Sequence, residues 1–248
     1  MKYEKFKFIL PKNNLKSIPL HQKYLYAALI SYFDIPKYYL LFWDDLIVFH
    51  EIFIEKLYDK EFYVSEGDTV LDIGASIGWY TCKISKLVGE KGNIISIEPD
   101  IINFNYLKRN IEINNINNVK MLNLGVWSSK GRKNFVLEKY TSSFNNNQKI
   151  EKKKAPSTIE VDTIDNILMS LKLKKVNLIK MDVEGAEVEV IKGANDTITN
   201  SKDLKLIISA YHKDSFGIES FEYLIPYLEK RNFRYLKKYL PIIFAIKN

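Results

Sequence analysis

The residues best suited to chemistry in this 248-residue sequence follow three short apolar runs. The first run is Val70–Trp79 (VLDIGASIGW), which passes through Gly74 and Gly78 into an expected helix. Gly74 permits a sharp turn, and Gly78 permits close approach of a ligand, or of the helix to the strand. The N–H groups at a helix start favour an anionic or carboxylate-bearing ligand. The Gly-x-x-x-Gly spacing does not fit the dinucleotide fingerprint, which disfavours a nicotinamide-dependent oxidoreductase. The alternative explanation of these glycines is structural: the connection between the strand and the helix needs glycine for its backbone conformation.

The second run ends at Glu98, in Ile95–Pro99 (ISIEP), about 20 residues after the glycine turn. In nucleoside-binding α/β folds an acidic residue at this place accepts hydrogen bonds from ribose hydroxyls. A carboxylate suits this task because it can accept from two adjacent hydroxyls at once. A solvent-exposed glutamate at a strand end would explain Glu98 alone. The glycine turn and Glu98 together favour a cofactor that contains a nucleoside.

The third run is Leu178–Glu187 (LIKMDVEGAE), where an apolar strand ends in charged groups before a glycine and a helix. Ligands of doubly wound sheets bind beyond the carboxyl ends of strands, where the strand order reverses. If this strand neighbours the first one, Asp182 and Glu184 would face Gly74 across that crevice. The alternative is that these are acids favoured at a helix start by the macrodipole, which fits Glu187 better than Asp182.

The elements that must position these residues alternate between short β-branched runs and amphipathic stretches. This alternation predicts βαβ units, with a parallel sheet covered by helices on both faces. The expected strands are Thr69–Ile73, Asn93–Ile97, Val119–Leu124, Val176–Met181 and Leu204–Ala210. The expected helices are Trp79–Val88, Ile101–Asn114, Ala186–Gly193 and Ile218–Lys230. Two further strands, Phe233–Lys237 and Leu240–Ile246, are close in sequence and predict an antiparallel hairpin at one edge.

Two segments differ from this α/β pattern, which occupies residues 65–248. Residues 1–64 are rich in Tyr, Phe, Leu and Ile, with helical spacing over Leu20–Phe33 and Asp45–Tyr58. We therefore expect a mainly helical N-terminal appendage. The stretch Thr141–Pro156 is polar, rich in Asn and Lys, and lacks a period, so it predicts a mobile surface loop.

Composition narrows the choice of partners and compartments. Lys and Arg number 37 against 30 Asp and Glu, so the formal net charge is +7. The excess lies in scattered surface runs such as Lys152–Lys154, so nucleic-acid binding is possible but not favoured. The one cysteine, Cys82, excludes an intrachain disulfide and a zinc site built from cysteines, and no metal site is predicted. No apolar stretch is long enough to span a bilayer, and the first residues do not form a signal peptide. We expect a soluble, cytoplasmic protein.

Taken together, these segments resemble the FkbM-like family of S-adenosylmethionine-dependent methyltransferases, from about Val64 to His212. The motifs that carry the resemblance are GDTVLDIGASIGWYT, the strand end IISIEPD, NLGVWSSKG, the strand-helix start TIEVDTID and IKMDVEGAEVEVIKGA, the last being the most family-specific. The resemblance implies a Rossmann-like, doubly wound, mostly parallel seven-stranded sheet whose final strand is antiparallel. It also implies S-adenosylmethionine as the methyl donor and O-methylation of a hydroxyl on a small molecule or saccharide.

The resemblance further implies a set of cofactor-binding residues. Glu98 would hold the ribose, and the glycine turn would line the methionine moiety. Asp182 and Glu184 would lie by the methyl group. The full set is Asp72, Gly74, Ala75 and Gly78 at the turn, Glu98 and Pro99 at the next strand end, Asn123, Leu124, Gly125 and Val126 near the adenine, and Asp182.

The catalytic candidates are Asp182, Glu184 and His212. Many family members carry Glu-x-His near the acceptor site, and here Ala210 takes the place of the acid while His212 matches the histidine. His212 could act as a general base, and a surface or capping histidine is the alternative. Methyl transfer to RNA, or a non-catalytic protein that binds S-adenosylmethionine, are the competing functions. The sequence has no Asp/Asn-Pro-Pro-aromatic run, which favours an oxygen acceptor over a nitrogen acceptor.

Overall fold

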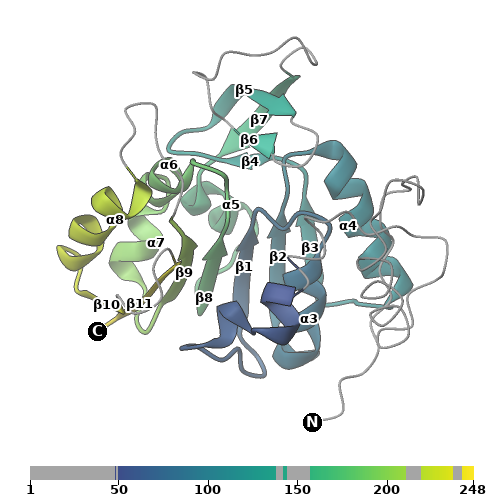
Figure 1. Cartoon of the computed structure of the whole chain (residues 1–248), viewed down its shortest axis with the longest axis horizontal. Helices are drawn as coiled ribbons and strands as arrows, with labels where there is room; N and C mark the ends of the chain where they lie inside the picture. Colours follow the sequence, from purple (N-terminus) through teal and green to yellow (C-terminus); the bar gives the residue numbers. More distant parts are fainter. Residues whose placement is uncertain (1–47, 49, 138–141, 144–156, 211–218, 237–241) are drawn as a thin grey trace, which may run out of the picture.

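The computed structural model describes residues 48, 50–137, 142–143, 157–210, 219–236 and 242–248 (Figure 1). Three predictions fall on other residues. The helix expected over Leu20–Phe33, the candidate base His212 and most of the loop expected over Thr141–Pro156 lie outside the described residues. Within the described part, no helix is long and apolar enough to cross a membrane.

The centre of the fold is a seven-stranded sheet with the order β10-β11-β9-β8-β1-β2-β3. The five strands from β9 to β3 are parallel, and β11 pairs antiparallel with both β9 and β10. The predicted doubly wound, mostly parallel sheet with an antiparallel hairpin at its edge is thereby confirmed. The strands are β1 (Thr69–Ile73), β2 (Asn93–Ile97), β3 (Val119–Leu122), β8 (Leu178–Met181), β9 (Lys205–Ser209), β10 (Phe233–Leu236) and β11 (Ile242–Lys247).

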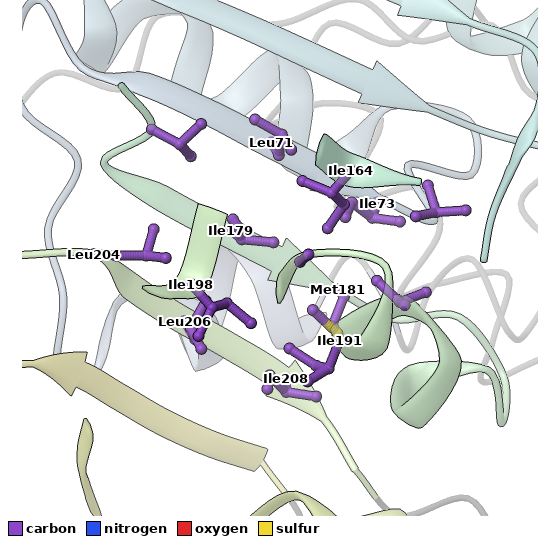
Figure 2. Close-up of a cluster of buried hydrophobic side chains, with 14 of the residues drawn as sticks. Leu71, Ile73, Ile164, Ile179, Met181, Ile191, Ile198, Leu204, Leu206 and Ile208 are labelled. Carbon is purple, nitrogen blue, oxygen red and sulfur yellow. The ribbon is translucent and has the colours of Figure 1, made fainter. Parts of the chain in front are cut away.

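Both faces of this sheet are buried, because successive strand residues point to opposite faces and both sets are apolar. Val70 belongs to the hydrophobic cluster on one face, whereas Leu71 and Ile73 belong to the cluster on the other. Figure 2 shows the second cluster, in which Leu71, Ile179 and Leu206 of three strands meet side chains of the covering helices. The helices are α3 (Trp79–Val88), α4 (Ile101–Ile113), α5 (Ile164–Ser170), α6 (Glu187–Lys192), α7 (Asn195–Asn200) and α8 (Ser220–Glu229).

A small second sheet begins directly after β3, at the carboxyl edge of the central sheet (Figure 1). Its order is β4-β7-β5-β6, with β4 parallel to β7 and the other pairs antiparallel. The sequence predicted neither β4, β5 nor β6, whereas the strand-helix start TIEVDTID corresponds to β7 and the first residues of α5. The strands of this sheet are β4 (Gly125–Val126), β5 (Gly131–Leu137), β6 (Ser142–Ser143) and β7 (Ser157–Asp162).

The described segment before β1 packs against the core rather than forming a continuous helix. It contains one turn of π-helix, η2 (His50–Ile54), and one 3₁₀ turn, η3 (Leu57–Asp59). The described part of the stretch expected to be helical over Asp45–Tyr58 is thus helical but divided into short turns. The division lies at Lys56, whose φ of 51° is left-handed. Three side chains of this segment are buried in the first hydrophobic cluster: Ile52, Phe53 and Tyr58.

Candidate functional site

The carboxyl ends of β1 and β8 meet where the strand order reverses, which is where ligands bind in doubly wound sheets. The backbone N–H of Asp182 donates to the carbonyl of Ile73 at 3.0 Å. Gly74 has a φ of 73°, and a Cβ at this position would lie 1.9 Å from the carbonyl oxygen of Asp182. The structure therefore brings Gly74 and Asp182 into direct contact, and this contact requires glycine.

Backbone and side-chain hydrogen bonds fix the loop between β1 and α3. The N–H groups of Gly74 and Ala75 both donate to the carbonyl of Ile97, at 3.0 and 3.1 Å. Further along, the Asn110 side chain of α4 donates to the carbonyl of Ile77 at 2.7 Å. The glycine turn is thus held by β2 and α4, so its backbone is fixed before any ligand arrives.

Glu98 lies at the end of β2 and joins the glycine turn to the next loop. Its Oε2 accepts from the N–H of Ser76 at 2.8 Å, and its Oε1 accepts from the N–H of Asp100 at 2.9 Å. Burial raises the pKa of Glu98 to about 7, although the two backbone N–H groups act in the opposite direction. An ionised carboxylate has four lone-pair sites, so both oxygens retain capacity to accept from ribose hydroxyls.

Asp72 forms a buried ion pair with Lys180 beneath the turn. Asp72 is 0% exposed, and its Oδ1 lies 3.2 Å from the Nζ of Lys180 on the neighbouring strand. Its Oδ2 accepts from the Thr81 hydroxyl at 2.6 Å, and Lys180 also donates to the carbonyl of Gly74 at 3.2 Å. The carboxylate of Asp72 is therefore engaged inside the protein, where it supports the turn. Sequence reasoning did not select Lys180.

Asp182 meets a tyrosine that the sequence did not single out. The hydroxyl of Tyr58 donates to Oδ2 of Asp182 at 3.1 Å. Burial first, and then the negative charge of Asp182, raise the pKa of Tyr58 well above its ordinary value, so the phenol stays protonated. Glu184 follows in the loop, half-buried, with a φ of 52°. Glu187 is buried and accepts from the N–H of Gly185 and the hydroxyl of Ser220, which agrees with a structural role at the helix start.

The other expected cofactor residues occupy different surroundings. Gly78 is buried against α4, and a Cβ there would lie 2.6 Å from Cδ1 of Leu107, so it serves helix packing. Asn123 is exposed and donates to the carbonyls of Glu98 and Pro99 at 2.9 and 3.1 Å. Leu124 is half-buried beside it. Gly125 and Val126 are buried in β4 and pair with β7 in the second sheet.

The described residues contain no group of three or more His, Cys, Asp or Glu side chains that could hold a metal ion. They do fit a nucleoside-containing group. The buried carboxylate of Glu98 lies at the end of β2, the fixed glycine turn follows β1, and the carboxylate of Asp182 lies at the end of β8 on the other side of β1. This arrangement can bind two adjacent hydroxyls at Glu98 and a positively charged group at Asp182.

Comparison with known proteins adds a family and two curated relatives. The family model described as methyltransferase FkbM domain matches residues 72–235. Methyltransferase 1 of Beauveria bassiana is 28% identical over 165 residues, which cover 59% of this chain and 66% of that protein. Hexuronic acid methyltransferase AglP of Haloferax volcanii is 30% identical over 133 residues, which cover 54% of this chain and 52% of that protein. The chain thus spans roughly half to two thirds of the length of these relatives.

A solved structure has the same fold. The crystal structure of methyltransferase FkbM from Methylobacillus flagellatus matches with a TM-score of 0.55 at 21% sequence identity. The match covers 80% of this chain and 47% of that one. This likeness shows a shared Rossmann-like fold.

Proposed function

Because this chain belongs to the methyltransferase FkbM domain family, we propose that it transfers a methyl group from S-adenosylmethionine to a hydroxyl of a small molecule or saccharide. The family predicted from the sequence is confirmed by the match over residues 72–235. The observation that carries the proposal is the contact of Asp182 with the glycine turn, with the buried carboxylate of Glu98 on the other side of that turn. A saccharide acceptor is supported by the relative described as a hexuronic acid methyltransferase.

Each residue of the site has a separate role in this proposal. Glu98 accepts hydrogen bonds from the ribose hydroxyls, and the backbone of Gly74 and Ala75 lines the methionine end. Asn123 and Leu124 lie by the adenine. When bound, S-adenosylmethionine supplies a methyl group on a positively charged sulfonium.

Asp182 acts on the acceptor hydroxyl in the proposed reaction. Its carboxylate stands at the reversal of strand order, where it faces the positive charge of the donor and orients the acceptor hydroxyl. It accepts the proton that this hydroxyl loses when the oxygen takes the methyl group, and it then returns that proton to water. Positioning and proton transfer are the two contributions that such a reaction needs from the protein.

The experiment measures transfer of labelled methyl groups to three acceptor classes: saccharides that contain glucuronic acid, neutral saccharides and RNA. We expect incorporation into a saccharide fraction. Asp182→Asn keeps the size of the side chain and removes its charge, so it should lower the rate by roughly 10²–10⁴-fold. Its melting temperature should stay close to that of the wild type. Asp203→Asn, at an exposed position in a loop, is the matched control.

Three results would contradict the proposal. Transfer to RNA alone would favour the competing RNA methyltransferase. Near-normal turnover of Asp182→Asn would move the proton-accepting role to another group, and a collapse in its stability would make Asp182 structural.

Glu98→Ala should weaken binding of S-adenosylmethionine by about 1.5–3 kcal/mol in calorimetry, the range for hydrogen bonds to a charged group. Unchanged affinity in a folded Glu98→Ala protein would refute the ribose assignment.

A further inference from the structure

The segment before β1 delivers one side chain to the candidate site. Tyr58 lies in η3, 14 residues ahead of the region that the family model matches. Its side chain is 5% exposed, and its hydroxyl donates to Oδ2 of Asp182 at 3.1 Å. The two residues are 124 positions apart in the chain, so this contact depends on how the segment is anchored.

Lys83 of α3 anchors that segment at two points. Its Nζ donates to the carbonyl of Ile52 at 2.7 Å and forms an ion pair with Asp59, the residue after Tyr58. The Tyr58 ring also packs edge-on against Tyr80, with centroids 5.3 Å apart and an interplanar angle of 78°. These contacts fix the chain on both sides of Tyr58 in the sequence and one edge of its ring, so the hydroxyl is directed toward Asp182.

Charged and titratable groups from several elements surround the Tyr58–Asp182 pair. The Nζ of Lys180 in β8 lies 5.4 Å from the centroid of the Tyr58 ring, and Lys180 is itself paired with Asp72 of β1. Glu51 of η2 acts on Tyr58 as a further negative charge. Tyr80 of α3 packs against the Tyr58 ring, and Glu184 follows two residues after Asp182 in the chain. Tyr58 donates a hydrogen bond to Asp182.

We propose that Tyr58 is a positioning residue for methyl transfer, and that its hydroxyl orients the Asp182 carboxylate and keeps it ionised. The inference rests on the proposed role of Asp182. A half-buried carboxylate at the end of an apolar strand loses water, and this loss disfavours its charged form. A hydrogen bond donated to the carboxylate favours its charged form and so opposes the effect of the lost water. The bond also fixes the plane of the carboxylate, so that its charge faces the donor.

The test compares the affinities of S-adenosylmethionine and S-adenosylhomocysteine by calorimetry across pH. The two ligands differ in the methyl group and its positive charge, so the ratio of their affinities reports the charge that faces the sulfonium. Groups that meet the shared parts of the ligands, including Glu98 at the ribose, cancel in this ratio. In the wild type the preference for the charged ligand should fall where Asp182 takes up a proton.

Tyr58→Phe keeps the ring and removes the hydroxyl. Because a hydrogen bond to a charged group is lost, the pH at which the preference for S-adenosylmethionine falls should rise by about one to two units. Tyr63→Phe is the matched control, because Tyr63 lies in the same segment and is 73% exposed. Asp59→Asn weakens the anchor without touching Tyr58, and it should shift the fall in the same direction. If Tyr58→Phe does not fold, Asp59→Asn decides.

The outcomes separate this inference from the proposed function. If Asp182→Asn abolishes the preference and Tyr58→Phe leaves its pH dependence unchanged, the positioning role of Tyr58 is refuted and the role of Asp182 stands. If Asp182→Asn retains the preference, Asp182 does not face the donor, and both proposals fail. A shift in Tyr58→Phe with none in Tyr63→Phe supports the inference.

Discussion

Replacing Gly74 by alanine tests whether the contact between β1 and β8 builds the site. The added Cβ would lie 1.9 Å from the carbonyl oxygen of Asp182 and 2.9 Å from its carbonyl carbon. Both atoms belong to the backbone, so no side chain can rotate away to make room. The end of β8 must therefore move until an ordinary contact distance of about 3.4 Å is restored. This movement would stretch or break the hydrogen bond that the N–H of Asp182 donates to the carbonyl of Ile73.

Three effects add up in this variant. The φ of 73° at Gly74 costs a residue with a Cβ about 1–2 kcal/mol. Overpacking of a closely fitted interior costs a further 1–3 kcal/mol or so. Loss of the hydrogen bond to Ile73 adds about 0.5–1.5 kcal/mol. We expect Gly74→Ala to lose roughly 3–6 kcal/mol of unfolding free energy, a large part of the stability of an ordinary domain.

Two other glycines separate these effects in urea unfolding. Gly67 has a φ of 85° and no atom within 4 Å of an added Cβ, so Gly67→Ala should show the conformational cost alone. Gly131 also has open space and has no positive φ, so Gly131→Ala should change the stability little. Calorimetry should find that Gly74→Ala has lost its affinity for S-adenosylmethionine. A loss of stability no greater than that of Gly67→Ala would refute the close contact.

The buried pair and the buried glutamate give two further predictions. Lys180→Met leaves Asp72 charged inside the sheet, so it should lose about 3–5 kcal/mol of unfolding free energy in urea. Adding Asp72→Asn should recover part of that loss, and strictly additive losses would contradict the pairing. Because the pKa of Glu98 is about 7, affinity for S-adenosylmethionine should rise as its carboxylate forms between about pH 6 and 8, with Glu98→Gln flattening the profile. The raised pKa of Glu98 also means that its contribution to the free energy of unfolding is fully present below pH 4.5 and is lost as pH rises toward 7. Equal pH–stability profiles for Glu98→Gln and wild type would contradict the raised pKa.

The strands and helix that border the glycine turn could be predicted to the residue. The bounds of β1, α3 and β2 agree with those expected from the sequence. Each of these strands is an apolar run bounded by polar or glycine-containing turns, and burial on both faces makes such runs continuous. The strand β8 begins at Leu178 rather than at the predicted Val176, although Val176 is buried. Val176 is buried before the first paired residue, so an apolar pattern extends the predicted strand beyond its pairing.

Apart from β7, the second sheet could not be predicted in the same way. Its first strand, β4, has two residues and therefore no detectable period. It is a strand because it pairs with Val161 and Asp162 of β7, which lie far along the chain. The resemblance implies that Gly125 and Val126 lie near the adenine, and this stays a prediction. In the structure they are buried in β4, and Asn123 and Leu124 carry the turn between the two sheets.

The residues that support the site differ in how clearly the sequence pattern indicates their roles. Asp72 and Lys180 stand one residue before the ends of two apolar strands, and a buried charge is costly unless it is paired. Opposite charges near the ends of two apolar strands are thus a signal that could have revealed the pair, which the register Asp72↔Lys180 shows in the structure. Tyr58 offered no such signal, because it is one of 16 tyrosines and reaches Asp182 only through a left-handed Lys56 and the anchor at Lys83. Chemistry-bearing groups can be found from local pattern because strand ends and glycine turns fix them. Their orientation is set by contacts over more than a hundred positions, such as the 124 between Tyr58 and Asp182.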